Sequence, residues 1–291
     1  MRIASLGMSA GAYVGHRLSD NSEFHRMVFN SIRLNRIETE RFRRSDEWRF
    51  LAYAFANRHT SNAQILQDLW VCFELEEKRG GVFVEFGATN GRTNSNSWLL
   101  EEKYGWTGVL AEPNPVWHAD LKRNRSAAID LRCIHAGSGE TVMFTATDSV
   151  DPELSGISDF QAGAHFADAR AKGVQIPVET VSLNQLLADH RTPCDIDYMS
   201  IDTEGSEYAI LSQFDFAKYR VKLMSVEQNA TTEPQLEALL ARQGYERVFH
   251  AFSQWDGWYV RGRPIRDDPA FARNAVRNRD GARARIEALP L

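Results

Sequence analysis

From residue 82 to residue 262 the sequence alternates between short apolar or strand-favouring runs and amphipathic stretches. We expect strands at 82–87, 107–113, 131–136, 197–205 and 222–229, and helices at 95–105, 206–214 and 233–243. Such alternation is typical of a doubly wound, mostly parallel sheet. Two further runs, 246–252 and 256–262, are close enough to pair as a hairpin. The predicted fold class is therefore α/β, with a mostly parallel seven-stranded sheet that ends in an antiparallel hairpin.

Helical patterns precede this region. Residues 1–60 read as a helical extension. One apolar face in it is expected to comprise Trp48, Leu51, Ala52 and Phe55. Another helix is expected to begin at the capping box of Ser61 and Gln64 and to end before Gly80. The predicted organisation is an extension at 1–60, a main domain at 61–262 with an insertion near 150–175, and a helical tail at 263–291.

Charge and cysteine content exclude several classes of function. A formal net charge of −5 over 291 residues gives no basic surface for nucleic acid. We expect no membrane-spanning segment, and residues 1–16 lack the basic start of a signal peptide. Three cysteines, Cys72, Cys133 and Cys194, are widely spaced and form no CxxC pair. This pattern predicts a reducing, cytoplasmic setting.

The first expected strand leads into a glycine-containing loop, and residues 82–96 read VFVEFGATNGRTNSN. Glycines let a backbone approach a ligand closely, and free amides at a helix start favour anionic or polar groups. The spacing Glu85-x-Gly87-x-x-x-Gly91 lacks the GxGxxG that binds a pyrophosphate. An acid two residues before the first glycine suits S-adenosylmethionine, whose amino-acid end carries an ammonium group. Glu112 closes the next strand, where an acid accepts hydrogen bonds from the ribose of either S-adenosylmethionine or NAD.

The glycine spacing and the terminal hairpin, which is usual for class I methyltransferases, both favour the methyl donor. More specific are the segments VEFGATNGRTNSN, TGVLAEPNPVWHADL, AGSGE, TVSLNQLL and DYMSIDTEGSEYAIL, with QILQDLW upstream. Together they resemble the FkbM family of S-adenosylmethionine-dependent methyltransferases over roughly residues 60–262. The resemblance implies a class I methyltransferase (Rossmann-like) fold and, usually, O-methylation of a sugar or natural-product hydroxyl.

The resemblance also implies roles for individual residues. The methionine part of the cofactor would be held by Glu85, Gly87, Ala88, Asn90 and Gly91. Glu112 and Pro113 would lie at the ribose, and the turn from Ala136 to Ser138 would flank the adenine. Gln228 departs from the pattern, because many family members carry histidine there. If that histidine acts as a base, this protein must use another group.

Oxygen-bearing side chains gather where the later strands end. Asp202 and Glu204 lie two residues apart at the end of one expected strand, and Glu227 and Asn229 do so at the end of the next. Alternate strand residues project to the same side, and open α/β sheets bind ligands at these carboxyl ends. Asp202, also expected near the cofactor, or Glu204 would act as general base. In the alternative mechanism Asp202, Glu227 and Asn229 would bind Mg²⁺.

Residues 155–173 lie between strands and depart from regular periodicity. A lid or acceptor-binding insertion would have this pattern, which makes His165 a further candidate base; a surface helix with an incidental histidine fits equally well.

Tryptophans near the candidate site divide into two groups. Trp98, Trp106 and Trp117 are expected to pack in the core, whereas Trp255 and Trp258 are less easily explained that way.

The sequence thus predicts an S-adenosylmethionine-dependent O-methyltransferase acting on a hydroxyl of a sugar, glycan or glycosylated natural product. Its partner would be a small-molecule or glycan acceptor, without nucleic acid or membrane. Two alternatives stay open: a nicotinamide-dependent oxidoreductase of Rossmann type, and a non-catalytic interaction module. Residues 20–58 could cover the domain's own core or that of a second copy, which leaves a homo-oligomer open.

Overall fold

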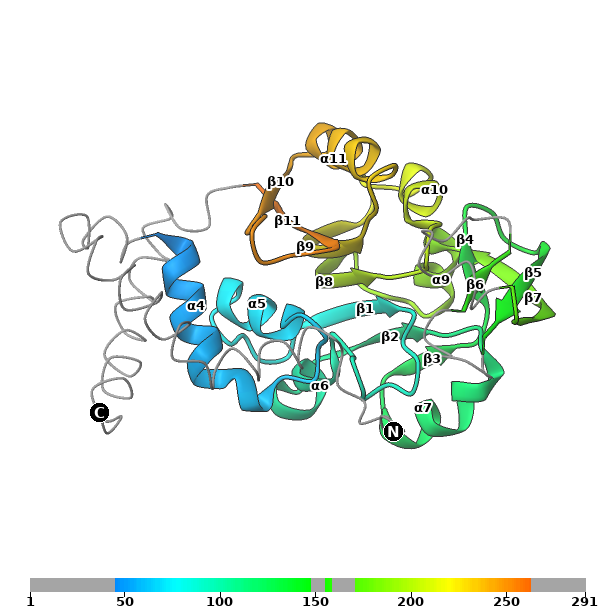
Figure 1. Cartoon of the computed structure of the whole chain (residues 1–291), viewed down its shortest axis with the longest axis horizontal. Helices are drawn as coiled ribbons and strands as arrows, with labels where there is room; N and C mark the ends of the chain where they lie inside the picture. Colours follow the sequence, from blue (N-terminus) through cyan, green and yellow to red (C-terminus); the bar gives the residue numbers. More distant parts are fainter. Residues whose placement is uncertain (1–44, 148–154, 159–170, 263–291) are drawn as a thin grey trace, which may run out of the picture.

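A seven-stranded sheet forms the core of the protein in a computed structural model that describes residues 45–147, 155–158 and 171–262 (Figure 1). In pairing order its strands are β10 (Tyr245–Val248), β11 (Asp256–Arg261), β9 (Arg220–Glu227), β8 (Asp195–Ile201), β1 (Val82–Phe86), β2 (Thr107–Ala111) and β3 (Ala128–Asp130). Neighbouring strands from β9 to β3 run parallel, whereas β11 is antiparallel to both β9 and β10. The α/β class and the antiparallel hairpin are confirmed, and the sheet is mixed.

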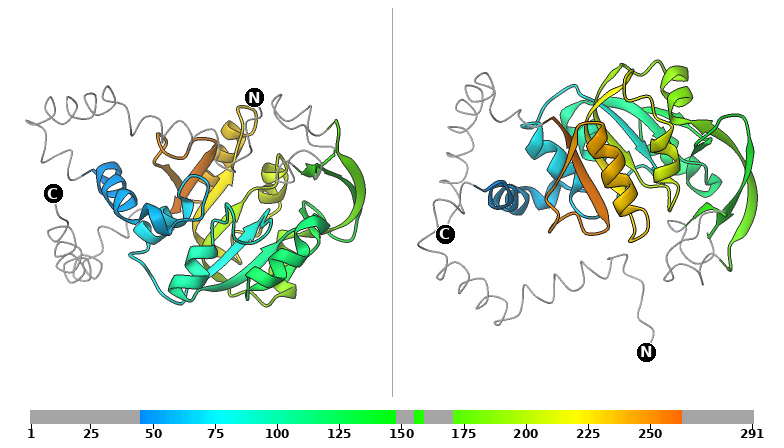
Figure 2. Two further views of the ribbon diagram at one scale, coloured as in Figure 1. Left: turned by 60° about the horizontal axis from the view of Figure 1, so that its bottom comes forward. Right: turned by 90° about the horizontal axis from the view of Figure 1, so that it is seen from above.

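Helices cover both faces of this sheet (Figures 1 and 2). Successive strand residues point to opposite faces, so Val84 and Phe86 pack into one core and Phe83 into the other. The first core includes α9 (Leu183–Asp189), α10 (Glu207–Ser212) and α11 (Glu233–Arg242). The second includes α4 (Asp46–Asn57), α5 (Gln67–Glu74), α6 (Trp98–Tyr104) and α7 (His118–Asn124). This layering brings the carboxyl ends of the parallel strands to one edge, where such sheets bind ligands.

A second sheet of four strands extends one side of the domain (Figure 2). Its order is β4 (Cys133–His135), β7 (Val174–Ser182), β5 (Thr141–Ala146) and β6 (Gly156–Ile157). The strand predicted at 131–136 is present at 133–135, but it pairs with β7 in the second sheet, and the edge strand of the main sheet is 128–130. Between them Arg132 donates to Asp130 from its backbone N (3.0 Å) and its guanidinium (2.9 and 2.6 Å), which turns the chain from one sheet to the other.

The predicted helix start at Ser61 is also wrong, because α5 begins at Gln67. The Ser61 hydroxyl donates to Asp68 Oδ1 (2.6 Å), and the backbone N of Asn62 donates to Asp68 Oδ2 (3.0 Å). These bonds fold residues 61–63 back against the start of α5, and Leu66 bridges the two in a left-handed conformation (φ 66°). Ser61 therefore closes a loop against Asp68 instead of capping a helix.

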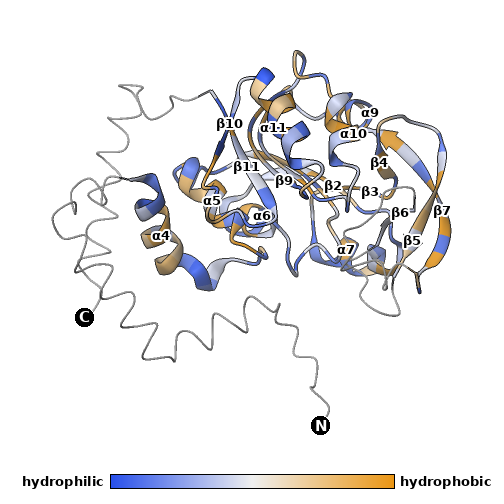
Figure 3. Ribbon diagram, turned by 45° about the horizontal axis from the view of Figure 1, so that its top comes forward, coloured by the Kyte–Doolittle hydropathy of each residue, from blue (hydrophilic) through white to orange (hydrophobic). Residues whose placement is uncertain are grey.

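Helix α4 is confirmed, but its buried face is not the predicted one. Phe50 and Ala54 are buried, whereas Leu51 and Phe55 are 43% and 72% exposed. The Phe50 ring packs edge-on against Trp258 (centroids 5.8 Å apart), so an aromatic cluster on other elements selects the face of α4. Figure 3 shows hydrophobic positions on α4.

Within the described ranges no helix has both the length and the hydropathy needed to cross a bilayer. Expectations for 1–44 and 263–291 lie outside those ranges.

Candidate active site

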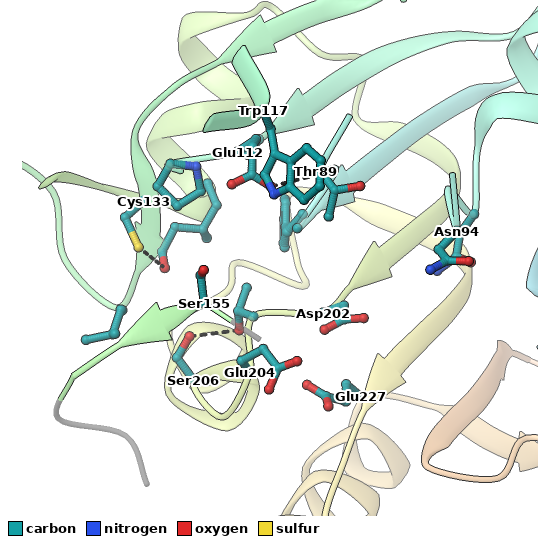
Figure 4. Close-up of a pocket in the computed structure, with 18 of the residues that line it drawn as sticks. Thr89, Asn94, Glu112, Trp117, Cys133, Ser155, Asp202, Glu204, Ser206 and Glu227 are labelled. Atoms are coloured by element: carbon teal, nitrogen blue, oxygen red, sulfur yellow. Dashed lines mark hydrogen bonds between the residues drawn. The ribbon is translucent and has the colours of Figure 1, made fainter. Parts of the chain in front are cut away.

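A cavity of about 460 Å³ lies at the carboxyl ends of β1, β2, β8 and β9 (Figure 4). Its walls come from the loops that follow these strands, the segment before α5, the second sheet and the hairpin loop before β11. Clefts that bind small molecules commonly have this size and combine apolar walls with a few convergent polar groups. The carboxylates of the lining lie at two ends of it (Figure 4).

Glu112 marks one end of the cavity. It follows β2, is only 4% exposed, and accepts hydrogen bonds from the backbone N of Thr89 (2.8 Å) and of Asn114 (2.7 Å). Burial raises the pKa of Glu112 to about 7, although these two bonds oppose the rise. Each carboxylate oxygen has one protein donor and keeps capacity for another. Trp117 lies beside Glu112 in the lining (Figure 4).

Gly87 brings the β1 loop close to the cavity. Its backbone N and that of Ala88 donate to Ala111 O at the end of β2 (3.1 and 3.3 Å). Gly87 has φ +67°, and a Cβ there would lie 2.3 Å from Asp202 O. Only glycine fits this approach, so the loop is held between the ends of β2 and β8.

Asp202, Glu204 and Glu227 mark the other end. Their carboxylates point toward one another (Figure 4), and one oxygen from each lies within 4.8 Å of the others. Strand alternation does not cause this convergence, contrary to expectation, because β8 ends at Ile201. A turn with Glu204 at φ +59° causes it instead. Glu207 Oε1 fixes the turn by accepting from the backbone N of Thr203 (2.9 Å) and of Gly205 (3.0 Å).

The cluster is electrostatically strained. Burial, then the charges of Glu204 and Asp256, raise the pKa of Asp202 well above its ordinary value. Burial, then the charge of Asp202, raise the pKa of Glu227 in the same direction. Carboxylates this close to one another resist simultaneous ionisation, and a cation placed among them would compensate their charge.

One other predicted residue of this site lies in the described part of the chain and does not join the cluster. Asn229 is exposed, and its Oδ1 accepts from the backbone N of Thr231 (2.9 Å) and of Thr232 (3.1 Å). It thus shapes the turn before α11 and is absent from the cavity lining, so its role as a metal ligand stays a prediction. His165 lies outside the described residues.

The family model described as "Methyltransferase FkbM domain" matches residues 85–247, more than half of the sequence. The matched segment contains Glu112 and all three members of the acidic cluster. The chain belongs to the FkbM methyltransferase family.

Solved structures similar to this FkbM family member include two methyltransferases. One is a precorrin-6y C5,15-methyltransferase from Geobacter metallireducens GS-15, with 10% identity, a TM-score of 0.35, and coverage of 66% of this chain and 85% of that one. The other is assigned as a sarcosine dimethylglycine methyltransferase from Galdieria sulphuraria, with 10% identity, a TM-score of 0.28, and coverage of 64% and 63%. No curated protein matches the sequence.

Four residues to which the FkbM resemblance gave the methionine part lie outside the cavity lining: Glu85, Ala88, Asn90 and Gly91. Glu85 is 3% exposed and accepts from the backbone N of Asn96 (2.7 Å) and the hydroxyl of Ser95 (3.1 Å). Asn90 Oδ1 accepts from two backbone N–H groups of its own turn. The structure therefore uses Glu85 and Asn90 to shape the loop, while Gly87 reaches the lining.

The predicted adenine turn is also displaced. Ser138 bonds to Ser182, away from the lining, and neither it nor Ala136 reaches the cavity. Cys133 and Ile134 of β4 form that wall instead. The turn is displaced because the chain passes from the main sheet to the second sheet between β3 and β4. Pro113 does line the cavity, as predicted.

Several lining residues were not predicted to belong to the site: Gln64, Gln67, Asn94, Asn96, Trp117 and Trp255. The resemblance of QILQDLW to an FkbM segment was the available signal for the two glutamines. Trp117 was expected in the core but lines the cavity. Trp258 is fully buried and stacks on Trp70 (centroids 5.0 Å apart), so it belongs to the core.

Gln228, the residue that departs from the FkbM pattern, does not face the cavity. It is buried beside Tyr259, and its side chain bonds to the Tyr259 hydroxyl at 3.0 Å. The presence of glutamine instead of histidine at position 228 therefore removes no candidate base from the cavity lining.

Proposed function

We propose that the chain is an S-adenosylmethionine-dependent O-methyltransferase acting on a hydroxyl of a sugar, glycan or glycosylated natural product. A single observation carries this proposal: one cavity holds a buried carboxylate suited to a ribose at one end and a carboxylate cluster suited to deprotonating an acceptor at the other. Cys72, Cys133 and Cys194 are free thiols, which supports a cytoplasmic setting.

The residues present fit the methyl donor. Glu112 has spare acceptor capacity for two ribose hydroxyls, and Gly87, in the lining, lets the backbone approach a ligand closely. Asn96 is 7% exposed and lines the cavity, and its Oδ1 has no hydrogen-bond partner within the described residues. An orphaned acceptor suits the cofactor's ammonium group. No Lys or Arg lines the cavity in the described part of the chain, which disfavours the pyrophosphate of a nicotinamide cofactor.

The bound cofactor would supply a methyl group already activated by its sulfonium. The protein has two tasks, which are to orient the acceptor hydroxyl and to remove its proton as the new bond forms. A base works best when its pKa lies near the operating pH, and burial raises the pKa of Asp202 in that direction. We assign proton removal to Asp202, while Glu204 and Glu227 accept hydrogen bonds from the acceptor.

The same carboxylates form a candidate Mg²⁺ site, because oxygen ligands are those that Mg²⁺ prefers. A cation would lower the pKa of the acceptor hydroxyl and remove the need for a base. Turnover measured after EDTA treatment, with and without added Mg²⁺, separates these roles. Undiminished turnover in EDTA supports the base, and its loss with recovery in Mg²⁺ supports the metal.

Glu112→Ala is expected to weaken binding of S-adenosylhomocysteine by roughly 10- to 100-fold, because charge-assisted hydrogen bonds are lost. The exposed Glu179 provides the control, since Glu179→Ala removes a carboxylate far from the lining. Thermal unfolding is the measurement: ligand at 100 times its dissociation constant stabilises by about 2.7 kcal/mol and should raise the midpoint by several degrees. A midpoint raised by NAD but not by S-adenosylhomocysteine would overturn the proposal.

Cofactor binding is expected to depend on pH. The folded-state pKa of Glu112, about 7, lies above its ordinary value of 4.5, so the stability contributed by the protonated form is present at low pH and lost as pH rises through 7. Ribose hydroxyls donate hydrogen bonds and therefore favour the ionised form of the Glu112 carboxyl, which accepts them. The stabilisation by S-adenosylhomocysteine should therefore grow between pH 6 and pH 8, and grow less in Glu112→Gln. An equal rise in both proteins would remove Glu112 from the cofactor site.

A further inference from the structure

We propose that the acidic end of the cavity is an acceptor subsite for an amino sugar, whose ring lies on Trp255 and whose ammonium group faces Asp202, Glu204 and Glu227. The inference rests on the proposed function and names the substrate class within it. It is drawn from the charge of the lining and from the position of one aromatic side chain.

The charge of the lining is of one sign. Its ionisable acids are Glu112, Asp202, Glu204 and Glu227, and no Lys, Arg or His lines the cavity among the residues that the structure describes. Glu112 is assigned to the cofactor, which leaves three carboxylates for the acceptor end. A carboxylate or phosphate on the acceptor would meet like charge in a partly desolvated site, whereas an ammonium group would meet opposite charge.

Trp255 supplies the apolar partner. It is 42% exposed, lines the cavity and lies in the loop before β11. Two bonds fix this loop: Trp255 O accepts from Gln228 N (2.9 Å), and Ser253 O accepts from Asp256 N (2.7 Å). An exposed indole offers a flat apolar face to a sugar ring and attracts a nearby cation through its π electrons. The indole and the carboxylates therefore favour the same charge on the ligand.

The test uses four methyl glycosides, those of glucosamine, N-acetylglucosamine, glucose and glucuronic acid, with EDTA-treated full-length protein and radiolabelled S-adenosylmethionine. The glucosaminide is expected to have a kcat/KM at least roughly tenfold above that of the N-acetyl and neutral glycosides, with no turnover of the glucuronide. NMR of the product should place the methyl group on oxygen, since a protonated amine has no lone pair to accept it.

Trp255 variants test the second feature. Trp255→Ala should raise KM for the glucosaminide by roughly 3- to 10-fold with kcat little changed, and Trp255→Phe should recover most of the loss. Affinity for S-adenosylhomocysteine should stay unchanged in both. Trp98→Ala, which removes an indole outside the lining, should leave KM unchanged.

Each other outcome overturns the inference. Two such outcomes are turnover of the glucoside or glucuronide equal to that of the glucosaminide, and transfer of the methyl group to nitrogen. The other two are failure of the glucosaminide to bind the complex of the protein with S-adenosylhomocysteine, and a strict requirement for Mg²⁺. Calorimetry with S-adenosylhomocysteine separates this failure from that of the proposed function. If the wild-type protein binds S-adenosylhomocysteine, only the acceptor class is wrong; if it does not, the methyl-transfer proposal fails as well.

Discussion

Asp202→Asn is expected to lower kcat by roughly 10²- to 10⁴-fold, the usual effect of removing a positioned acid or base. The substitution keeps the shape of the side chain but removes the carboxylate to which we assign the acceptor's proton. Affinity for S-adenosylhomocysteine should change much less than kcat, because Glu112 at the other end of the cavity is untouched. Single-turnover methyl transfer and calorimetry measure the two effects separately.

Asp195→Asn is the matched control. Asp195 begins β8, the strand that Asp202 follows, and pairs with Arg220 on the surface (2.7 Å). Its loss should leave kcat unchanged. Wild-type turnover in Asp202→Asn would show that the acidic cluster does not take part in the reaction.

Arg125→Met is expected to lower the free energy of unfolding by about 3–5 kcal/mol, because removing one partner leaves buried charges uncompensated. Arg125 is fully buried and donates to Glu101 Oε2 (2.6 Å), Ser97 Oγ (2.8 Å) and Gly91 O (3.1 Å). Its guanidinium also lies 3.6 Å from Glu85 Oε2. These bonds tie the loop after β1 to the end of α7.

Chemical denaturation measures this loss, and Arg220→Met is its control. The Arg220–Asp195 pair is solvent-exposed and should contribute no more than about 1 kcal/mol. Equal losses in the two variants would mean that the Arg125 network does not hold the loop. We also expect Arg125→Lys to fall short of wild type, since an ammonium group cannot reproduce the fork of the guanidinium.

Local sequence patterns were sufficient for the parallel strands β1, β2, β8 and β9 and for the hairpin. Runs such as VFVEF and DIDYMSI are buried almost throughout, as their continuous apolar or β-favouring character indicates. The same reasoning placed Glu112 and Asp202 at strand ends, and both line the cavity. Residues at the carboxyl ends of parallel strands can therefore be predicted from a single sequence.

Features that depend on contacts between residues distant in sequence could not be predicted. The buried face of α4 is chosen by Trp258, and the role of Glu85 is set by Arg125 and the serines of the following loop. The second sheet begins where Arg132 folds back on Asp130, and no periodicity marks that change. Trp255 reaches the cavity because the hairpin loop is fixed by bonds to Gln228 and Ser253. In each case tertiary contacts decide between local patterns that fit equally well.

The most direct test of the central claim is a crystal structure of the protein with S-adenosylhomocysteine. Our account predicts ribose hydroxyls on the Glu112 carboxylate, the cofactor's ammonium group at Asn96 Oδ1, and the sulfur facing Asp202 and Glu227. A ribose placed away from Glu112, or a sulfur that faces β5 and β6 instead of the acidic cluster, would contradict it.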